Sequence, residues 1–109
     1  MPDVVLGDFE QIVLLALLRC GDEAYGVPIA NAIAESTGKR VILASVYNTL
    51  ERLEQKGFVS SSFGEPTAER GGRAKRHFEI EAAGHRALNA SQDALKSMSE
   101  GLSRRWKRA

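Results

Sequence analysis

Apolar residues recur at helical spacing near the start of the chain and predict a helix that begins at about Asp8. One apolar face follows the i, i+3, i+4, i+7 spacing of an amphipathic helix and consists of Phe9, Ile12, Val13, Ala16, Leu17 and Cys20. A second apolar stripe beside it consists of Leu14, Leu15 and Leu18. Such a helix is covered on more than one side. The cover is either the rest of its own core or a second subunit, and the pattern leaves both readings open.

The next segment predicts a second helix and a short extended stretch. Gly21-Asp22-Glu23 interrupts the first helix, and Pro28 suits the first turn of the next one, because proline is tolerated there. Gly38 is suited to the position just after that helix, where a left-handed backbone is common. The apolar run Val41-Ile42-Leu43, with two β-branched residues, then predicts a very short strand.

A third predicted helix starts at or near Ser45 and runs to Gly57. Its inward stripe consists of Leu43, Val46, Leu50 and Leu53. The opposite face carries hydrogen-bonding and basic side chains without a carboxylate: Ser45, Asn48, Thr49, Arg52 and Lys56. This composition suits contact with base edges and phosphates. An ordinary solvated helix face has a similar composition, so the helix alone does not decide between the two readings.

Two strands and a long loop follow the third helix. Residues 58–63 predict one strand, and residues 77–81 predict its partner, with Phe78 and Ile80 alternating against polar neighbours. The loop between them is rich in turn residues. Its second half has no acid and carries Arg70, Arg73, Lys75 and Arg76. Such a loop is either a cationic finger for an anionic partner or a solubilising connection.

The last predicted helix follows Ala83-Gly84 and reaches close to the end of the chain. A seam at spacings of 3, 4, 3 and 4 resembles that of a coiled coil and consists of Leu88, Ser91, Leu95, Met98 and Leu102. Together with the second stripe of the first helix, it favours a homodimer over a seam that covers its own domain. The predicted dimer interface is Leu14, Leu18, Leu88, Leu95, Met98 and Leu102.

Composition and charge narrow the class of protein. The 109 residues are 43% hydrophobic and 27% charged, which is typical of a globular domain and too apolar for a disordered chain. The net charge is only +1, so a uniformly basic nucleic-acid coat is excluded. Charge is unevenly placed, however: residues 1–38 carry a net −5 and residues 39–109 a net +6. This asymmetry hints at an anionic partner for the basic part.

The apolar run over residues 12–18 is too short to cross a bilayer. Acidic residues precede it, whereas a signal peptide begins with positive charge. With its single cysteine, Cys20, the chain forms no internal disulfide. We therefore expect a cytoplasmic protein without a membrane partner.

Candidate catalytic and metal-binding groups are few. His77 and His85 lie eight residues apart without an acidic cluster, and Cys20 falls in a helix expected to be buried. Gly71-Gly72 lies within a hairpin rather than between a strand and a helix, which is where a phosphate-binding loop is found. The sequence therefore predicts no enzyme, no metal site and no cofactor.

The order of elements is that of a winged helix-turn-helix: mainly α, with a small β-hairpin, followed by a long C-terminal helix. We assign residues 1–82 to a winged-helix DNA-binding domain and residues 83–109 to a C-terminal dimerisation helix in the same compact unit. In this arrangement the third helix enters the major groove of DNA, and the basic hairpin loop lies along the neighbouring groove or backbone.

The same residues resemble the PadR-like family of transcriptional regulators over about residues 5–90. The resemblance is carried by Leu6-Gly7, Tyr25-Gly26, SVYNTLERLEQKGFV at residues 45–59, GGRAKRHFEI at residues 71–80, and Ala83-Gly84. Members are usually homodimeric winged-helix DNA-binding proteins, often repressors. Their C-terminal helix mediates dimerisation, and in some members a ligand lodges near the subunit interface. The chain is similar to the shorter members.

Carried over residue by residue, the resemblance implies DNA contacts at Ser45, Tyr47, Asn48 and Arg52, and hairpin contacts at Arg73, Lys75 and Arg76. Two departures stand out. Asn48 occupies a position after the tyrosine where the family commonly has proline, and Pro28 follows Tyr25-Gly26-Val27 where the commoner pattern lacks it.

Together these observations predict a sequence-specific regulator that binds double-stranded DNA, as a homodimeric repressor under the control of a small effector. The complete predicted DNA-binding set is Ser45, Tyr47, Asn48, Thr49, Arg52, Arg73, Lys75 and Arg76. Tyr47 is also compatible with a purely structural role. Met98 and Trp106 either line an effector pocket or pack in the interface. The alternative function is a winged-helix module for protein interaction or assembly, without DNA binding.

Overall fold

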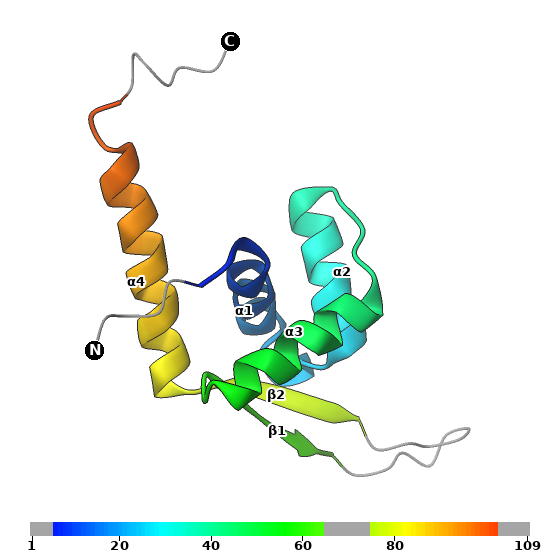
Figure 1. Ribbon diagram of the computed structural model, residues 1–109. Helices are drawn as coiled ribbons and strands as arrows, with labels where there is room; N and C mark the ends of the chain where they lie inside the picture. Colours follow the sequence, from blue (N-terminus) through cyan, green and yellow to red (C-terminus); the bar gives the residue numbers. More distant parts are fainter. Residues whose placement is uncertain (1–5, 65–74, 103–109) are drawn as a thin grey trace.

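The computed structural model describes residues 6–64 and 75–102, which form four helices and one hairpin (Figure 1). The elements in chain order are α1 (Asp8–Cys20), a 3-10 turn (Gly21–Glu23), α2 (Gly26–Thr37), α3 (Leu43–Gln55), β1 (Val59–Phe63), β2 (Arg76–Ile80) and α4 (Ala82–Ser99). In this part of the chain, no helix is long and apolar enough to cross a membrane.

Helix α1 lies between α2 and α4, as Figure 1 shows. It begins at Asp8, as the sequence predicted, and the Gly7 N–H donates to Glu10 Oε1 at 2.9 Å, which holds the first turn. Leu14 is completely buried in the core of its own subunit. Its assignment to a dimer interface was therefore wrong. The exposed stripe of α1 is instead Leu15 and Leu18, each 41% accessible to solvent.

Helix α2 ends at Thr37, and Gly38 adopts the left-handed backbone (φ 75°) expected of a helix terminator. The strand predicted over residues 41–43 is not present. Ile42 is extended (φ −78°, ψ 129°) but serves as the N-cap of α3. The only sheet in the described residues consists of β1 and β2, so this run lacks a strand to pair with. Leu43 is 38% exposed and does not belong to the inward stripe of α3.

Strands β1 and β2 form an antiparallel hairpin with Val59 opposite Ile80 and Phe63 opposite Arg76. Phe78, at the centre of β2, is 2% exposed and belongs to the same core as Val13, Ile29 and Leu50. Its N–H donates to the carbonyl oxygen of Ala24 at 2.8 Å. This bond attaches the hairpin to the connection between α1 and α2. Together with the burial of Phe78, it fixes the hairpin against the three-helix core.

Helix α4 has a buried half and an exposed half. Gly84 lies so close to the Phe58 carbonyl oxygen that a Cβ there would collide with it. Leu88 and Ser91 are 4% and 2% exposed, and Ser91 Oγ accepts from the Leu6 N–H at 3.1 Å. Leu88 thus packs into its own core, and its assignment to a dimer interface was wrong.

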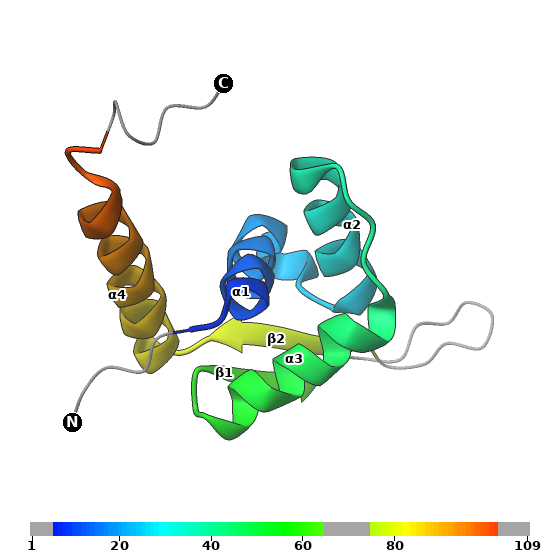
Figure 2. The ribbon, with the colours of Figure 1, turned by 45° about the horizontal axis from the view of Figure 1, so that its top comes forward.

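Beyond Ser91 the side chains of α4 are exposed through Met98, and this half projects away from the rest of the molecule (Figure 2). Leu95 is 59% exposed and Met98 77% exposed. The molecule is thus a winged helix-turn-helix with an added long helix, as predicted. The division of function at residue 82 stays a prediction.

Candidate nucleic-acid interface

Helix α3 exposes most of the polar face that the sequence predicted. Asn48 is exposed, Ser45 is half-buried, and the Arg52 side chain is 55% exposed. Thr49, however, is only 2% exposed. One residue along a helix turns by about 100°, which carries Thr49 from the exposed side of Asn48 towards the core residues Val46 and Leu53. Thr49 is therefore wrongly placed among the DNA contacts.

Thr49 supports a neighbouring residue instead. Its hydroxyl oxygen accepts from Arg52 Nη2 at 3.5 Å. On the other side, Glu10 Oε2 lies 3.7 Å from Arg52 Nε. Two groups from the protein thus restrain one guanidinium that remains half open to solvent. A restrained arginine loses less conformational freedom when it binds a base or a phosphate.

Glu10 connects the start of α1 to the end of α3. The residue is 8% exposed, and its Oε2 accepts from Lys56 Nζ at 2.7 Å. Burial by itself raises the pKa of the Glu10 carboxyl. The hydrogen bonds from Lys56 and the Gly7 N–H, with the positive charges of Lys56 and Arg52, outweigh burial and lower the pKa below its ordinary value. Glu10 therefore remains ionised and holds the basic side of α3 in place.

Tyr47 is packed between elements. Its ring lies directly against Gly26, where an added Cβ would collide with it, and its centroid is 6.5 Å from that of Phe78. These contacts fix the start of α2 against α3 and give Tyr47 a structural role. A contact between Tyr47 and DNA stays a prediction.

Arg76 joins the hairpin to α3. Its Nη2 lies 2.7 Å from Glu54 Oε1 and its Nη1 lies 3.4 Å from Glu51 Oε2. Its Nε donates to Ser61 Oγ on the paired strand. The sequence predicted a free cation for DNA at this position. The structure instead places a clamp there, which neutralises two carboxylates of α3 and holds the hairpin beside that helix.

The other predicted cations of the hairpin have different outcomes. Lys75 Nζ hydrogen-bonds to the Tyr25 hydroxyl at 3.1 Å and lies 4.6 Å from the centre of the Tyr25 ring. His77 packs edge-on against the same ring, at 5.2 Å between centroids. The end of the hairpin next to its loop is thus tied to Tyr25, the residue before α2. Arg73 lies outside the described residues.

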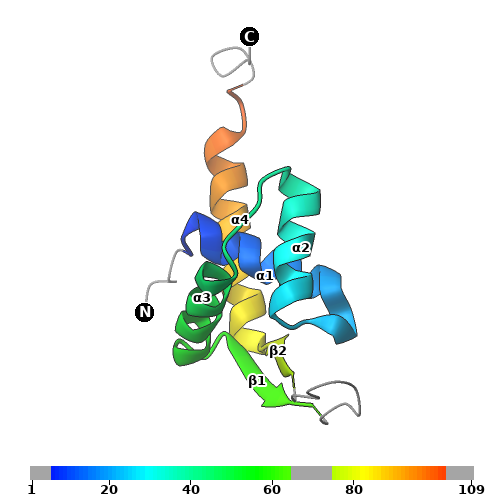
Figure 3. The same ribbon diagram turned by 90° about the vertical axis from the view of Figure 1, so that its right-hand side faces the viewer.

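Sequence reasoning missed a basic pair between α2 and α3. Lys39 and Arg40 are both exposed in this connection. A signal was available, because no acidic residue occurs between Glu35 and Glu51. Figure 1 shows that α3 begins on the side of the molecule where β1 ends and β2 begins, away from α4, and Figure 3 views the molecule from that side. The basic pair therefore adds to the positive charge at this end of α3.

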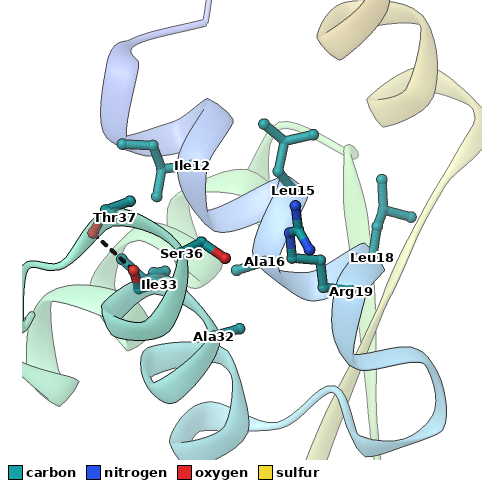
Figure 4. Close-up of a pocket in the computed structure, with 9 residues that line it drawn as sticks. All are labelled: Ile12, Leu15, Ala16, Leu18, Arg19, Ala32, Ile33, Ser36 and Thr37. Carbon is teal, nitrogen blue, oxygen red and sulfur yellow. Dashed lines mark hydrogen bonds between the residues drawn. The ribbon is translucent and has the colours of Figure 1, made fainter.

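A separate groove of about 430 Å³ lies between α1 and α2 (Figure 4). Its walls are mostly apolar, with Arg19, Ser36 and Thr37 as the polar exceptions. The apolar lining is Ile12, Leu15, Ala16, Leu18, Ala32 and Ile33. The groove therefore includes the exposed stripe of α1. Among the described residues, no cluster of acidic, histidine or cysteine side chains could hold a metal ion.

Comparisons with known proteins agree on one family and fold. The family described as the transcriptional regulator PadR-like family matches residues 14–90. A PadR-like transcription factor from Bacteroides fragilis has a TM-score of 0.71 and 19% identity, covering 88% of this chain and 87% of that one. A transcriptional regulator from Clostridium thermocellum has a TM-score of 0.71 and 18% identity, covering 96% and 100%.

A PadR-like transcriptional regulator from Bacillus cereus has a TM-score of 0.69 and 16% identity, covering 93% of both chains. At these identities, the likeness to solved structures establishes a shared winged-helix fold. No curated protein matches the chain.

Proposed function

This chain belongs to the PadR-like family of transcriptional regulators, and we propose that it acts as a homodimer that binds double-stranded DNA sequence-specifically and represses transcription. The observation that carries the proposal is the clamp between Arg76 and Glu54. It holds the cationic start of β2 beside α3, which exposes Asn48 and Arg52. A helix for the major groove and a hairpin for the backbone are thereby combined in one rigid unit.

Asn48 and Arg52 are the proposed readers of base edges. An asparagine amide pairs with adenine through two hydrogen bonds, and an arginine guanidinium pairs with guanine in the same manner. Arg52 is held by Glu10 and Thr49, so its orientation is set before DNA arrives. Ser45, on the same helix as these readers, and Lys75, immediately before the hairpin's second strand, are proposed phosphate contacts.

The proposed dimer uses the exposed half of α4. Water disfavours the exposed apolar side chains of Leu95 and Met98. The helix ends at Ser99, so Leu102, which is 38% exposed, lies just beyond their stripe rather than on it. The exposed Leu15 and Leu18 of α1, with the adjoining groove, offer an apolar surface to α4 of a second subunit. Two-fold symmetry then places the two α3 helices on half-sites about 34 Å apart, on an operator with an inverted repeat.

Repression follows when the dimer covers a promoter. A small effector bound at the proposed interface would change the angle between the two α3 helices and so weaken or strengthen DNA binding.

The proposal is tested by selecting genomic fragments with the purified protein and measuring the affinity of the best fragment. We expect an inverted repeat, and we expect Asn48→Ala and Arg52→Ala each to weaken binding by about ten-fold or more. Arg86→Ala, at an exposed position in the first half of α4 and outside the proposed dimer surface, is the matched control and should bind normally. The logarithm of the binding constant should fall by about 0.9 per contacted phosphate for each unit of log salt.

Arg76 is unsuitable for this test, because reversing its charge would also break the clamp to Glu51 and Glu54. Enrichment of no fragment by a correctly folded protein would contradict the proposal and favour the protein-interaction function. If the Asn48→Ala and Arg52→Ala variants bind the operator as tightly as the unchanged protein, these two residues do not read its bases.

A further inference from the structure

The N-terminal end of α3 carries an apolar side chain that the fold leaves in solvent. Ile42 is 73% exposed, although it lies in a connection only a few residues long. Val41, beside it, is half-buried and packs against the core. The chain therefore buries one β-branched residue of this pair and presents the other outwards.

Helix stability does not explain an isoleucine at this position. Ile42 is the N-cap of α3, and its carbonyl oxygen accepts from the Ser45 N–H at 2.9 Å. The N-cap strongly favours serine, threonine, aspartate or asparagine, because their side chains accept a hydrogen bond from the first turn. An isoleucine side chain has no acceptor. Both helix capping and solvation disfavour Ile42, which is the kind of local exception that functional surfaces show.

The surroundings of Ile42 indicate what it contacts. Lys39 and Arg40 precede it, and the exposed Ala44 and Asn48 follow on successive turns of one side of α3. No carboxylate lies in the sequence from residue 36 to residue 50. An apolar side chain surrounded by basic residues and an asparagine suits a polyanion that also exposes small apolar groups.

DNA has such groups in its major groove, where each thymine presents a C5 methyl beside the phosphate backbones. The short side chain of Ala44 allows the duplex to approach the first turn of α3 closely. We propose that Ile42 is a specificity-determining residue that packs against a thymine methyl in each half-site of the operator. This inference rests on the proposed function and adds one base to what α3 reads.

The experiment that tests this proposal removes the thymine C5 methyl from the DNA and, separately, shortens the Ile42 side chain of the protein. Deoxyuridine differs from thymidine only in lacking the C5 methyl of the base. Each thymine of the selected operator is therefore replaced by deoxyuridine, one symmetric pair at a time, and affinity is measured by fluorescence anisotropy. We expect one pair of substitutions to weaken binding of the unchanged protein by about four-fold for each methyl removed.

The protein half of the experiment uses Ile42→Ala and Ile42→Val. Ile42→Ala should weaken binding to the thymine operator and lose its sensitivity to deoxyuridine at the same pair. Ile42→Val keeps two methyl groups and should remain sensitive. Deoxyuridine outside the half-sites is the control on the DNA. Because Ile42 is so exposed, both variants should unfold at the same urea concentration as the unchanged protein.

The outcomes separate this inference from the function on which it rests. If the protein binds its operator but no deoxyuridine substitution weakens binding, the inference fails and the DNA-binding function stands. It also fails if Ile42→Ala loses as much affinity on substitution as the unchanged protein does, because another residue then contacts the methyl. If the protein binds no DNA fragment, the proposed function fails and the inference falls with it.

Discussion

At the scale of single residues, the charges around α3 are matched locally. Glu10 is paired with Lys56 and lies near Arg52, while Glu51 and Glu54 are paired with Arg76. Each pair joins α3 to a neighbouring element, so the pairs position the helix as well as neutralise charge. The contribution of Glu10 can be isolated because its pKa is lowered in the folded protein.

Glu10→Gln should destabilise the protein near neutral pH by about 1–2 kcal/mol, because a neutral amide loses the charge-assisted bond to Lys56. A carboxyl whose pKa is lower in the folded state than in the unfolded state stabilises the fold above its unfolded pKa. This contribution disappears as pH falls through the folded pKa. The difference in the free energy of unfolding between the two proteins should therefore be largest near pH 7. It should shrink as the pH falls below 4.5, the ordinary pKa of a glutamate carboxyl.

Urea unfolding across that pH range measures the effect. Glu23→Gln, at an exposed carboxylate in the 3-10 turn, is the matched control and should differ little from the unchanged protein. A constant difference between the Glu10→Gln and unchanged proteins down to about pH 3 would show that the ionised carboxylate is not what stabilises the fold.

At the scale of elements, the hairpin is positioned from both of its strands. Phe78 of β2 is buried in the core and bonded to Ala24, while Arg76 binds Glu54 of α3 and Ser61 of β1. Ser61 also donates to the Glu54 carboxylate at 2.9 Å. Helix, strand and strand thus share one polar cluster, and this cluster fixes the direction in which the hairpin leaves α3.

A double-mutant cycle between Arg76→Gln and Glu54→Gln tests this cluster. We expect a coupling free energy of about 1 kcal/mol in urea unfolding, because the pair is partly shielded from solvent but not buried. The pair of Arg76→Gln with Glu79→Gln is the control, since Glu79 is an exposed residue of β2 itself. Additive effects for the Arg76 and Glu54 substitutions would refute a clamp.

At the scale of the whole molecule, most of the large exposed apolar side chains belong to two groups, with Val27 of α2 outside both. Leu15, Leu18, Leu95 and Met98 belong to α1 and α4, whereas Ile42 and Phe63 belong to the end at which α3 begins and the hairpin opens. The exposed half of α4 has too few contacts with its own subunit to bury its apolar stripe. This distribution supports a molecule with one surface for a second copy and another for DNA.

The double variant Leu95→Glu and Met98→Glu should convert the proposed dimer to a monomer, because two charges per subunit would have to be buried in the interface. Its helix content should be retained, since both side chains are solvent-exposed in the single subunit. Sedimentation velocity gives the mass, and circular dichroism gives the helix content.

Ser97→Glu introduces a charge on the opposite side of the same helix and should leave the dimer intact. Leu88→Glu, at a buried position, should instead unfold the protein. A dimer that survives the Leu95 and Met98 substitutions would exclude this half of α4 from the interface.

The sequence by itself determined the order of the four helices and the hairpin, although it also predicted a strand over residues 41–43 that is absent and a last helix longer than α4, which ends at Ser99. Helix start at Asp8, helix termination before Gly38 and the alternation around Phe78 are local effects of periodicity, capping and backbone geometry. Such effects act between residues close in the chain, so they can be read from it. The polar side of α3 was recognised for the same reason, although the helical turn places Thr49 on the buried side.

The tertiary structure decided which apolar and charged residues remain available. Leu14 and Leu88 belong to stripes that look suitable for a dimer, but distant parts of the chain bury them. Arg76 belongs to a basic loop in sequence, yet it meets two carboxylates more than twenty residues away. Ile42 belongs to an apolar run that predicted a strand, yet the part of the chain that the structure describes places no strand beside it. Burial and ion pairing depend on contacts between residues far apart in the sequence. The local sequence pattern around a residue does not specify those contacts.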